Sequence, residues 1–386
     1  MGTMNISSDA VQFLLLATKG ASTAYERQQL ITLFRSLGAD SAWNVARENK
    51  IEALVGTVVA DACEPSVLGE EWGNRLILNE RRVELLLKSV SEVTRHFEEQ
   101  GIPHSAVESA GVMLGSSLPF SALGSGDIDI LVCRDRLRSA VDAFERAGFR
   151  AVNRRDRPAA RFEMQKTEAD GTVLWVNVFS VAFDRMWVPL TWSDQSDKWL
   201  SRRQESGRWP GINILKVEDS LAFVSMHTSL HSYVRSPGLR LHVDVDRLVR
   251  DNDVDWQEYV EQVNAMGVPK RAFFSVQLAR ELLGTPIPDR VLDSLAPSPF
   301  VRKYVRRLLD ENGVIEDGHP KLTRWQTPLL DVLLHERGFF SWLGSALVPP
   351  RSWMSEHFGV GSNEDDSLLK LHWRRYCRLL TAWNPK

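Results

Sequence analysis

The chain has 386 residues, 43% of them hydrophobic and 25% charged, which is typical of a globular protein with two or three structural units. Its 47 basic and 50 acidic residues give a net charge of −3, and this balance argues against a nucleic-acid partner. The three cysteines have no CxxC spacing, so they predict neither a disulfide framework nor a zinc site. Because the apolar run from 11 to 17 is too short to span a bilayer, we expect no membrane partner and a cytoplasmic location.

Helical periodicity dominates the first hundred residues. A cap at Ser8 predicts a helix that continues through Leu16. The stretch Glu70–Glu99 repeats apolar residues every three or four positions, which predicts an amphipathic helix packed on another element. A Gly-Ile-Pro tripeptide then ends the pattern. We therefore define residues 1–100 as an N-terminal helical region.

The pattern changes to the two-residue period of β-strands between residues 101 and 200. Four strands are predicted, at Ile102–Val107, Asp127–Val132, Arg161–Lys166 and Thr172–Val181. The last two are expected to form a hairpin around an Asp-Gly turn. A helix is predicted from Arg136 to Ala147. Residues 101–200 are therefore interpreted as a small α/β core.

Helical periodicity returns from Leu215. One helix is predicted through His231, a second over Leu239–Arg250, and a third from Trp256. Residues 201–386 are accordingly interpreted as a C-terminal helical region. The predicted fold class is α+β, with a sheet-containing core flanked by two helical regions.

Asp127 and Asp129 lie two residues apart on a predicted strand, so both side chains project from one face. The alternate residues Ile128 and Ile130 point into the core. Two carboxylates on one face can bind a divalent cation, and Mg²⁺ takes one or two carboxylates together with phosphate oxygens. This pattern is typical of sites that transfer phosphoryl or nucleotidyl groups, although solvated carboxylates at a strand end produce the same spacing.

Other polar side chains have several interpretations. His227 and His231 lie on one helix face, and Asp244 lies on the next helix. These three residues can form a metal site, line a substrate cleft, or tie the helices through a His–Asp hydrogen bond, which we favour. A basic run extends from Arg154 to Arg161. In one interpretation its arginines bind a triphosphate or an acidic acceptor, and in the other they belong to a solvated loop. Glu163 is a substitute acid or an exposed residue.

The order of these motifs resembles the bacterial uncharacterised nucleotidyltransferase family, a branch of the DNA polymerase beta superfamily. The sequence GSGDIDILV at 124–132 resembles the Asp-x-Asp strand of that family, and 138–149 resembles the helix that follows it. Residues 215–231, 239–256 and 349–354 fit in the same order. The resemblance covers nearly the whole chain and implies a minimal nucleotidyltransferase core with a mixed sheet.

The resemblance also implies the roles of individual residues. The implied site consists of Asp127, Asp129 and Asn177 for catalysis, and Ser109, Ser116 and Arg161 for binding the nucleotide. The two aspartates would bind one or two Mg²⁺ ions, with an NTP as substrate. Asn177 would orient a bound water or the acceptor. Ser116 is included because of a second alignment, in which Gly115-Ser116 is the Gly-Ser pair that precedes Asp-x-Asp and Ser116 binds phosphate at a helix N-terminus. For both Ser109 and Ser116, the alternative role is helix capping.

Four positions differ from the family pattern. This chain has Glu108-Ser109 where the family usually has Lys-Gly, and Leu123 where the family commonly has an arginine. It has Asn177 where the family usually has an acidic residue, and Phe179 where the family has a histidine. Glu108 would repel a phosphate that lysine would attract. Asn177 can bind a cation only through an uncharged oxygen.

The sequence therefore predicts Mg²⁺-dependent transfer of a nucleoside monophosphate from an NTP to a small-molecule or protein acceptor. The four differences favour an alternative, a degenerate protein of this fold that binds a ligand or partner in the cleft. A third interpretation uses the aspartates as acid and base in another reaction. Whether the chain is an active enzyme stays open at this point.

Overall fold

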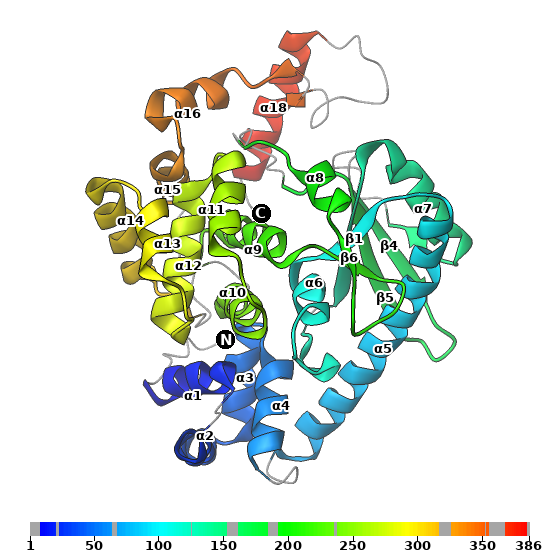
Figure 1. Cartoon of the computed structure of the whole chain (residues 1–386), viewed down its shortest axis with the longest axis vertical. Helices are drawn as coiled ribbons and strands as arrows, with labels where there is room; N and C mark the ends of the chain where they lie inside the picture. The colour runs from blue at the N-terminus through cyan, green and yellow to red at the C-terminus, as the bar shows by residue number, and fades with distance from the viewer. Residues whose placement is uncertain are drawn as a thin grey trace.

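Helices cover both faces of one mixed β-sheet (Figure 1). The computed structural model describes residues 8–20, 23–63, 68–124, 126–152, 161–183, 192–234, 238–315, 326–351, 353–354 and 367–383. This architecture confirms the predicted α+β fold class. Among the described residues, no helix has the length and apolar character needed to cross a bilayer.

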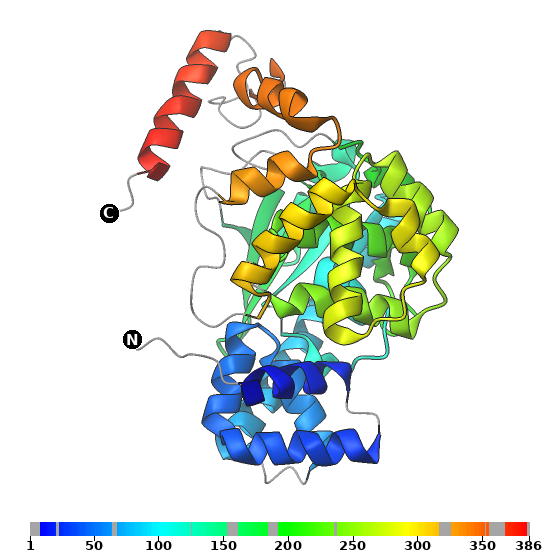
Figure 2. The ribbon, with the colours of Figure 1, turned by 90° about the vertical axis from the view of Figure 1, so that its left-hand side faces the viewer.

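The N-terminal helices pack together at one end of the molecule (Figure 2). They are α1 (Ser8–Lys19), α2 (Ala24–Leu37), α3 (Ala39–Glu48), α4 (Glu52–Ala62) and α5 (Glu70–Glu99). A capping box begins α2, because Thr23 Oγ1 accepts from the Glu26 amide while the Glu26 carboxylate accepts from the Thr23 amide. These bonds satisfy two amides that no helical carbonyl can reach.

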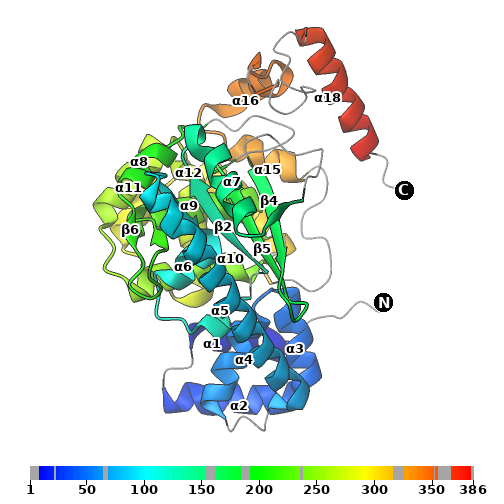
Figure 3. The ribbon, with the colours of Figure 1, turned by 90° about the vertical axis from the view of Figure 1, so that its right-hand side faces the viewer.

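Helix α5 extends from this end of the molecule along the sheet (Figure 3). Its apolar side chains recur every three or four residues and are buried against the sheet: Val83, Leu86, Val90, Val93 and Phe97. Burying each of them contributes roughly 1.5–3 kcal/mol. The predicted bounds of this helix are confirmed.

The strands within the described residues form one sheet in the order β3-β4-β5-β2-β1-β7-β6. Their bounds are β1 His104–Val107, β2 Asp127–Val132, β3 Arg150–Ala151, β4 Arg161–Thr167, β5 Val173–Phe179, β6 Gln204–Glu205 and β7 Asn213–Ile214. β2 is antiparallel to β1 and parallel to β5. The β4–β5 hairpin turns at Gly171, whose φ of +85° favours glycine. The four predicted strands and their hairpin are therefore confirmed.

Successive residues of β2 point to opposite faces of the sheet. Ile128, Ile130 and Val132 pack with α5 and α7 (Leu137–Arg146). Leu131 belongs to the core cluster that contains the C-terminal helices. Because Asp127 and Asp129 share the face of Leu131, they face the C-terminal side of the molecule.

From Val217 onward the described elements are helices, whereas β6 and β7, which also follow residue 200, belong to the sheet. The helices are α9 (Val217–Leu230), α10 (Leu239–Asp251), α11 (Trp256–Ala265), α12 (Pro269–Leu283), α13 (Asp289–Leu295), α14 (Pro299–Asn312), α15 (Gln326–Leu334), α16 (Gly338–Leu347) and α18 (Leu368–Trp383). Helix α6 (Glu108–Leu114) connects β1 with this region by packing on α9 and α10. The division of the chain at residues 100 and 200 stays a prediction.

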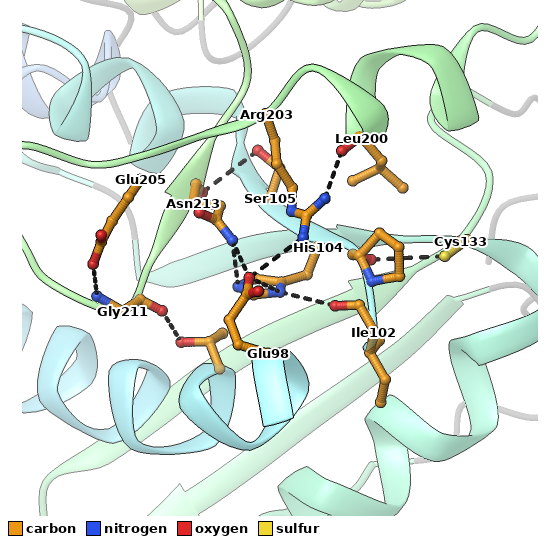
Figure 4. A network of polar contacts seen from close by, with 12 residues as sticks. Glu98, Ile102, His104, Ser105, Cys133, Leu200, Arg203, Glu205, Gly211 and Asn213 are labelled. Carbon is orange, nitrogen blue, oxygen red and sulfur yellow. Dashed lines mark hydrogen bonds and ion pairs between the residues drawn. The ribbon is translucent and has the colours of Figure 1, made fainter. Parts of the chain in front are cut away.

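A polar network ties α5 to β1 and β7 (Figure 4). The Asn213 side chain donates to Glu98 Oε1 at 2.6 Å, and Arg203 Nη2 donates to the same oxygen at 3.4 Å. His104 is fully buried beside them, with Nε2 3.3 Å from the Asn213 side-chain nitrogen and Nδ1 3.1 Å from the Ile102 carbonyl oxygen. Burial lowers the pKa of His104 to about 4, so the imidazole is neutral at pH 7.

Candidate active site

Asp127 and Asp129 project from the same face of β2, as their spacing predicts. Asn177 on β5 lies beside Asp129 in the strand register. Its side-chain nitrogen donates to Asp127 Oδ2 at 2.8 Å and to Asp129 Oδ1 at 3.1 Å. Asp127 is half-buried, whereas Asp129 is only 6% exposed. The amide therefore bridges the two carboxylates without neutralising their charge.

The polar face continues onto β4. Glu163 lies directly opposite Asn177, so its side chain emerges on the same face. Arg161, two residues earlier, donates from Nη2 to Asp129 Oδ1 at 3.2 Å. The Arg161 guanidinium also lies 5.1 Å from the centre of the Phe179 ring. Asp129 is thus contacted by both an amide and a cation.

Glu108 enters this region from the end of β1. The preceding residue, Val107, lies opposite Asp129 in the β1–β2 register. Glu108 has a φ of +55°, a left-handed conformation that is uncommon for residues other than glycine. Strain of this kind costs about 1–3 kcal/mol and concentrates at functional sites. The Glu108 carboxylate lies 3.7 Å from His227 Nδ1, and His227 Nε2 lies 3.1 Å from His231 Nε2.

Ser109 connects α6 with α10. Its hydroxyl donates to Asp244 Oδ2 at 2.7 Å and accepts from Arg240 Nε at 3.0 Å. Burial raises the pKa of Asp244, while the positive charge of Arg240 and the hydrogen bond from Ser109 lower it. The serine therefore helps to position α6, and its predicted contact with a nucleotide stays a prediction.

Burial disfavours the ionised form of the carboxylates on this face. Burial, and then the charge of Glu108, raise the pKa of Asp129 well above its usual range, against the opposing effect of Arg161. Burial also raises the pKa of Glu108 to about 7, again against Arg161. Burial and the charge of Arg240 lower the pKa of His227 to about 3, so this imidazole is neutral at pH 7. A bound cation would therefore stabilise the ionised carboxylates.

Ser116 does not lie where the second alignment predicts. It follows the C-terminal end of α6, where Gly115 is the cap, and not a helix N-terminus. Its hydroxyl donates to the Met113 carbonyl oxygen at 3.4 Å, and the residue is 6% exposed. The placement of Ser116 at a helix N-terminus is therefore wrong, because the small residues before it form the body of the helix.

The favoured His–Asp hydrogen bond is also wrong. The buried carboxylate of Asp244 accepts from Ser109, while His227 contacts His231 and Glu108. Within the described ranges, no three His, Cys, Asp or Glu side chains are arranged to hold a metal ion. Of the basic run, residues 154–157 lie outside the described residues, and Arg161 reaches the site.

Two arginines near the site were missed by the sequence analysis. Arg240, on α10, contacts Ser109. Arg82, on α5, lies 3.7 Å from the position that a Cβ on Gly126 would take. Burial lowers the pKa of Arg82, and the negative charge of Asp127 opposes that effect. Arg240 lies in a segment that fits the family order and Arg82 does not, but both lie on amphipathic helices rich in charge, so only tertiary packing shows that they approach the site.

The donor set fits a hard divalent cation. Asp127 and Asp129 present carboxylate oxygens from one face, and Asn177 adds a carboxamide that also carries an oxygen. Mg²⁺ commonly takes one or two protein carboxylates and completes its shell with water and substrate phosphate. Asp127 and Asp129 would hold the ion.

Comparison with known proteins gives one family. Residues 35–284 match the model of a family described as uncharacterised nucleotidyltransferase. Among solved structures, the chain is similar to an antigenic nucleotidyltransferase-like protein from Paracoccidioides brasiliensis, at 12% sequence identity and a TM-score of 0.36. That similarity covers 54% of this chain and 92% of the other. No curated protein matches the sequence.

Proposed function

Because the chain belongs to the uncharacterised nucleotidyltransferase family, we propose that it transfers a nucleoside monophosphate from an NTP to a small-molecule or protein acceptor in a Mg²⁺-dependent reaction. An acceptor oxygen or nitrogen forms a bond to the α-phosphorus. The bond from that phosphorus to the α–β bridging oxygen breaks, pyrophosphate leaves with the electron pair, and the acceptor proton passes to solvent.

The observation that supports this proposal is that two carboxylates, Asp127 and Asp129, project from one face of β2 beside the Asn177 carboxamide. Both carboxylates share one face, and burial together with Glu108 raises the pKa of Asp129 even though Arg161 contacts it. Mg²⁺, when bound, would neutralise triphosphate charge and lower the pKa of the acceptor. Asp127 and Asp129 would fix the position of the ion, and Asn177 would orient the acceptor or a water through its carboxamide.

Basic side chains of the site would contact the triphosphate. Arg161 on β4 contacts Asp129, Arg240 on α10 contacts Ser109, and Arg82 on α5 lies within reach of the charge of Asp127. Guanidinium groups bind phosphate oxygens through directed N–H donors, which positions the α-phosphorus. These arginines would take the role of the lysine and arginine that the chain lacks at positions 108 and 123.

A second candidate function is ligand binding without transfer. It is favoured by the hydrogen bonds from Asn177 to both aspartates and by the ion pair between Arg161 and Asp129. In this arrangement, protein donors occupy carboxylate oxygens that a metal would use. Such a protein would bind a ligand or partner with the same face and release no pyrophosphate.

Calorimetry and a pyrophosphate assay separate these functions. The wild-type protein is titrated with each NTP in the presence of Mg²⁺, and pyrophosphate release is followed with water as acceptor. Transfer predicts metal-dependent binding and slow release, both lost in Asp127→Asn and Asp129→Asn. Metal-independent ligand binding that survives both substitutions would favour the second candidate. Absence of NTP binding at millimolar concentration would refute the first.

A further inference from the structure

Arg161 forms an ion pair with Asp129 in the structure. One N–H group, on Nη2, contacts Asp129 Oδ1 at 3.2 Å, so the ion pair is single and not bidentate. Arg161 Nε is buried and has no hydrogen-bond partner. The guanidinium thus retains donor capacity that its contact with Asp129 leaves unused.

The surroundings of Arg161 hold its guanidinium beside the site. Phe179 lies directly opposite Arg161 across the β4–β5 pair, and its ring is 5.1 Å from the guanidinium carbon. An aromatic face attracts a guanidinium that lies within about 6 Å of the ring centre. The Arg161 side chain is 37% exposed, whereas that of Asp129 is 8% exposed. The arginine head therefore lies between a buried acid and solvent.

Two differences from the family pattern have the same consequence. Asn177 in place of an acid removes one negative charge from the face, and Phe179 in place of a histidine provides a ring against which Arg161 lies. With one fewer acid and one cation in contact, the aspartates are partly neutralised before any metal arrives.

We propose that Arg161 exchanges partners during substrate binding: it holds Asp129 in the metal-free protein and transfers to the triphosphate when metal and nucleotide bind. This inference rests on the proposed function. A divalent cation at Asp129 would displace Arg161 from the carboxylate, because the doubly charged ion interacts more strongly with the carboxylate than one guanidinium does. The freed guanidinium then meets the negative charge that enters with the nucleotide.

The exchange makes metal and nucleotide binding interdependent. Mg²⁺ alone must displace Arg161 from Asp129 and leaves a partly buried guanidinium without its carboxylate partner, so the affinity for Mg²⁺ is reduced. Nucleotide supplies a new partner for the arginine and removes that cost. Each ligand therefore raises the affinity of the other by the same factor.

The test compares Arg161→Met with Lys166→Met by calorimetry. Lys166 is a matched control, because it lies on the same strand but pairs with Glu168 at 3.0 Å. For Arg161→Met, we expect Mg²⁺ alone to bind about five- to tenfold more tightly, since its competitor is gone. Each NTP with saturating Mg²⁺ should bind about tenfold more weakly, since a charge-assisted phosphate contact is lost. Lys166→Met should change neither affinity by more than about twofold.

The opposite signs of the two changes are diagnostic. Arg161→Gln serves as a second variant, and circular dichroism checks that each variant is folded. Unchanged or weaker Mg²⁺ binding in both Arg161 variants would overturn the inference while leaving the proposed function intact, as would equal changes in Lys166→Met. A wild-type protein that binds neither Mg²⁺ nor any NTP would instead refute the proposed function and the inference together.

Discussion

Replacing Glu108 with glutamine is expected to stabilise the metal-free protein at neutral and alkaline pH. Below pH 4.5, Glu108 is protonated in both the folded and the unfolded chain, so its charge costs nothing. Between pH 4.5 and the folded pKa of about 7, the unfolded chain loses the proton while the folded chain keeps it. Stability therefore falls as pH rises through this window, and the full cost is present above pH 7.

The size of the effect follows from those two pKa values. A folded pKa of about 7 against the ordinary 4.5 corresponds to at most about 3 kcal/mol at pH 8. Because the Glu108 side chain is 21% exposed, we expect about 1–3 kcal/mol of added stability in Glu108→Gln. The left-handed backbone is equally unfavourable for glutamine, so it does not contribute to the difference.

Urea unfolding at pH 8 and pH 4, in buffer with EDTA, measures this difference. Glu99→Gln is the control, because the Glu99 side chain is 71% exposed and pairs with His96 on the helix surface. The reasoning is refuted if Glu108→Gln is no more stable than wild type at pH 8, or if its advantage is the same at pH 4.

Further predictions concern the site and the core. Asp127→Asn and Asp129→Asn should remain folded and lose metal-dependent binding of NTP, as measured by calorimetry. Gly111→Ala places a Cβ 2.7 Å from the Ala106 carbonyl oxygen, so it should destabilise the protein by about 1–3 kcal/mol in urea unfolding and displace α6. Burial lowers the pKa of His104 to about 4, so between pH 6.5 and pH 4 the unfolded chain gains a proton that the folded chain does not. The free energy of unfolding should therefore fall as pH falls through this range. His104→Asn should make the urea midpoint less dependent on pH there.

Local patterns in the sequence predict the long elements well. The apolar period of Glu70–Glu99 and the tripeptide after it give the bounds of α5, because helix formation depends on neighbouring residues. The strand bearing Asp127 and Asp129 is likewise predicted, since alternation is a property of the strand itself. The two-residue strands β6 and β7 were not predicted, because so short a segment has no period and is a strand only through its partner.

The candidate site is predicted only in part for the same reason. The sequence places both aspartates on one strand, and the resemblance assigns Asn177 to the same site, but the register of β2 with β5 that brings them together comes from the fold. Arg82 and Arg240 approach the site through packing of α5 and α10, which no short-range signal encodes. The histidine prediction was wrong because helix spacing shows which side chains share a face, and not which neighbour that face meets.

The length of α5 has a consequence for how the chain can be divided. Its 30 residues extend roughly 45 Å as one rod, with Trp72 in the N-terminal cluster and Phe97 beneath the sheet. A chain cut after residue 100 would lose α5, whose apolar side chains pack on β2 and β5, because α5 belongs to the amino-terminal fragment. The first hundred residues are therefore inseparable from the strand that presents the aspartates, and a shortened chain lacking them should aggregate.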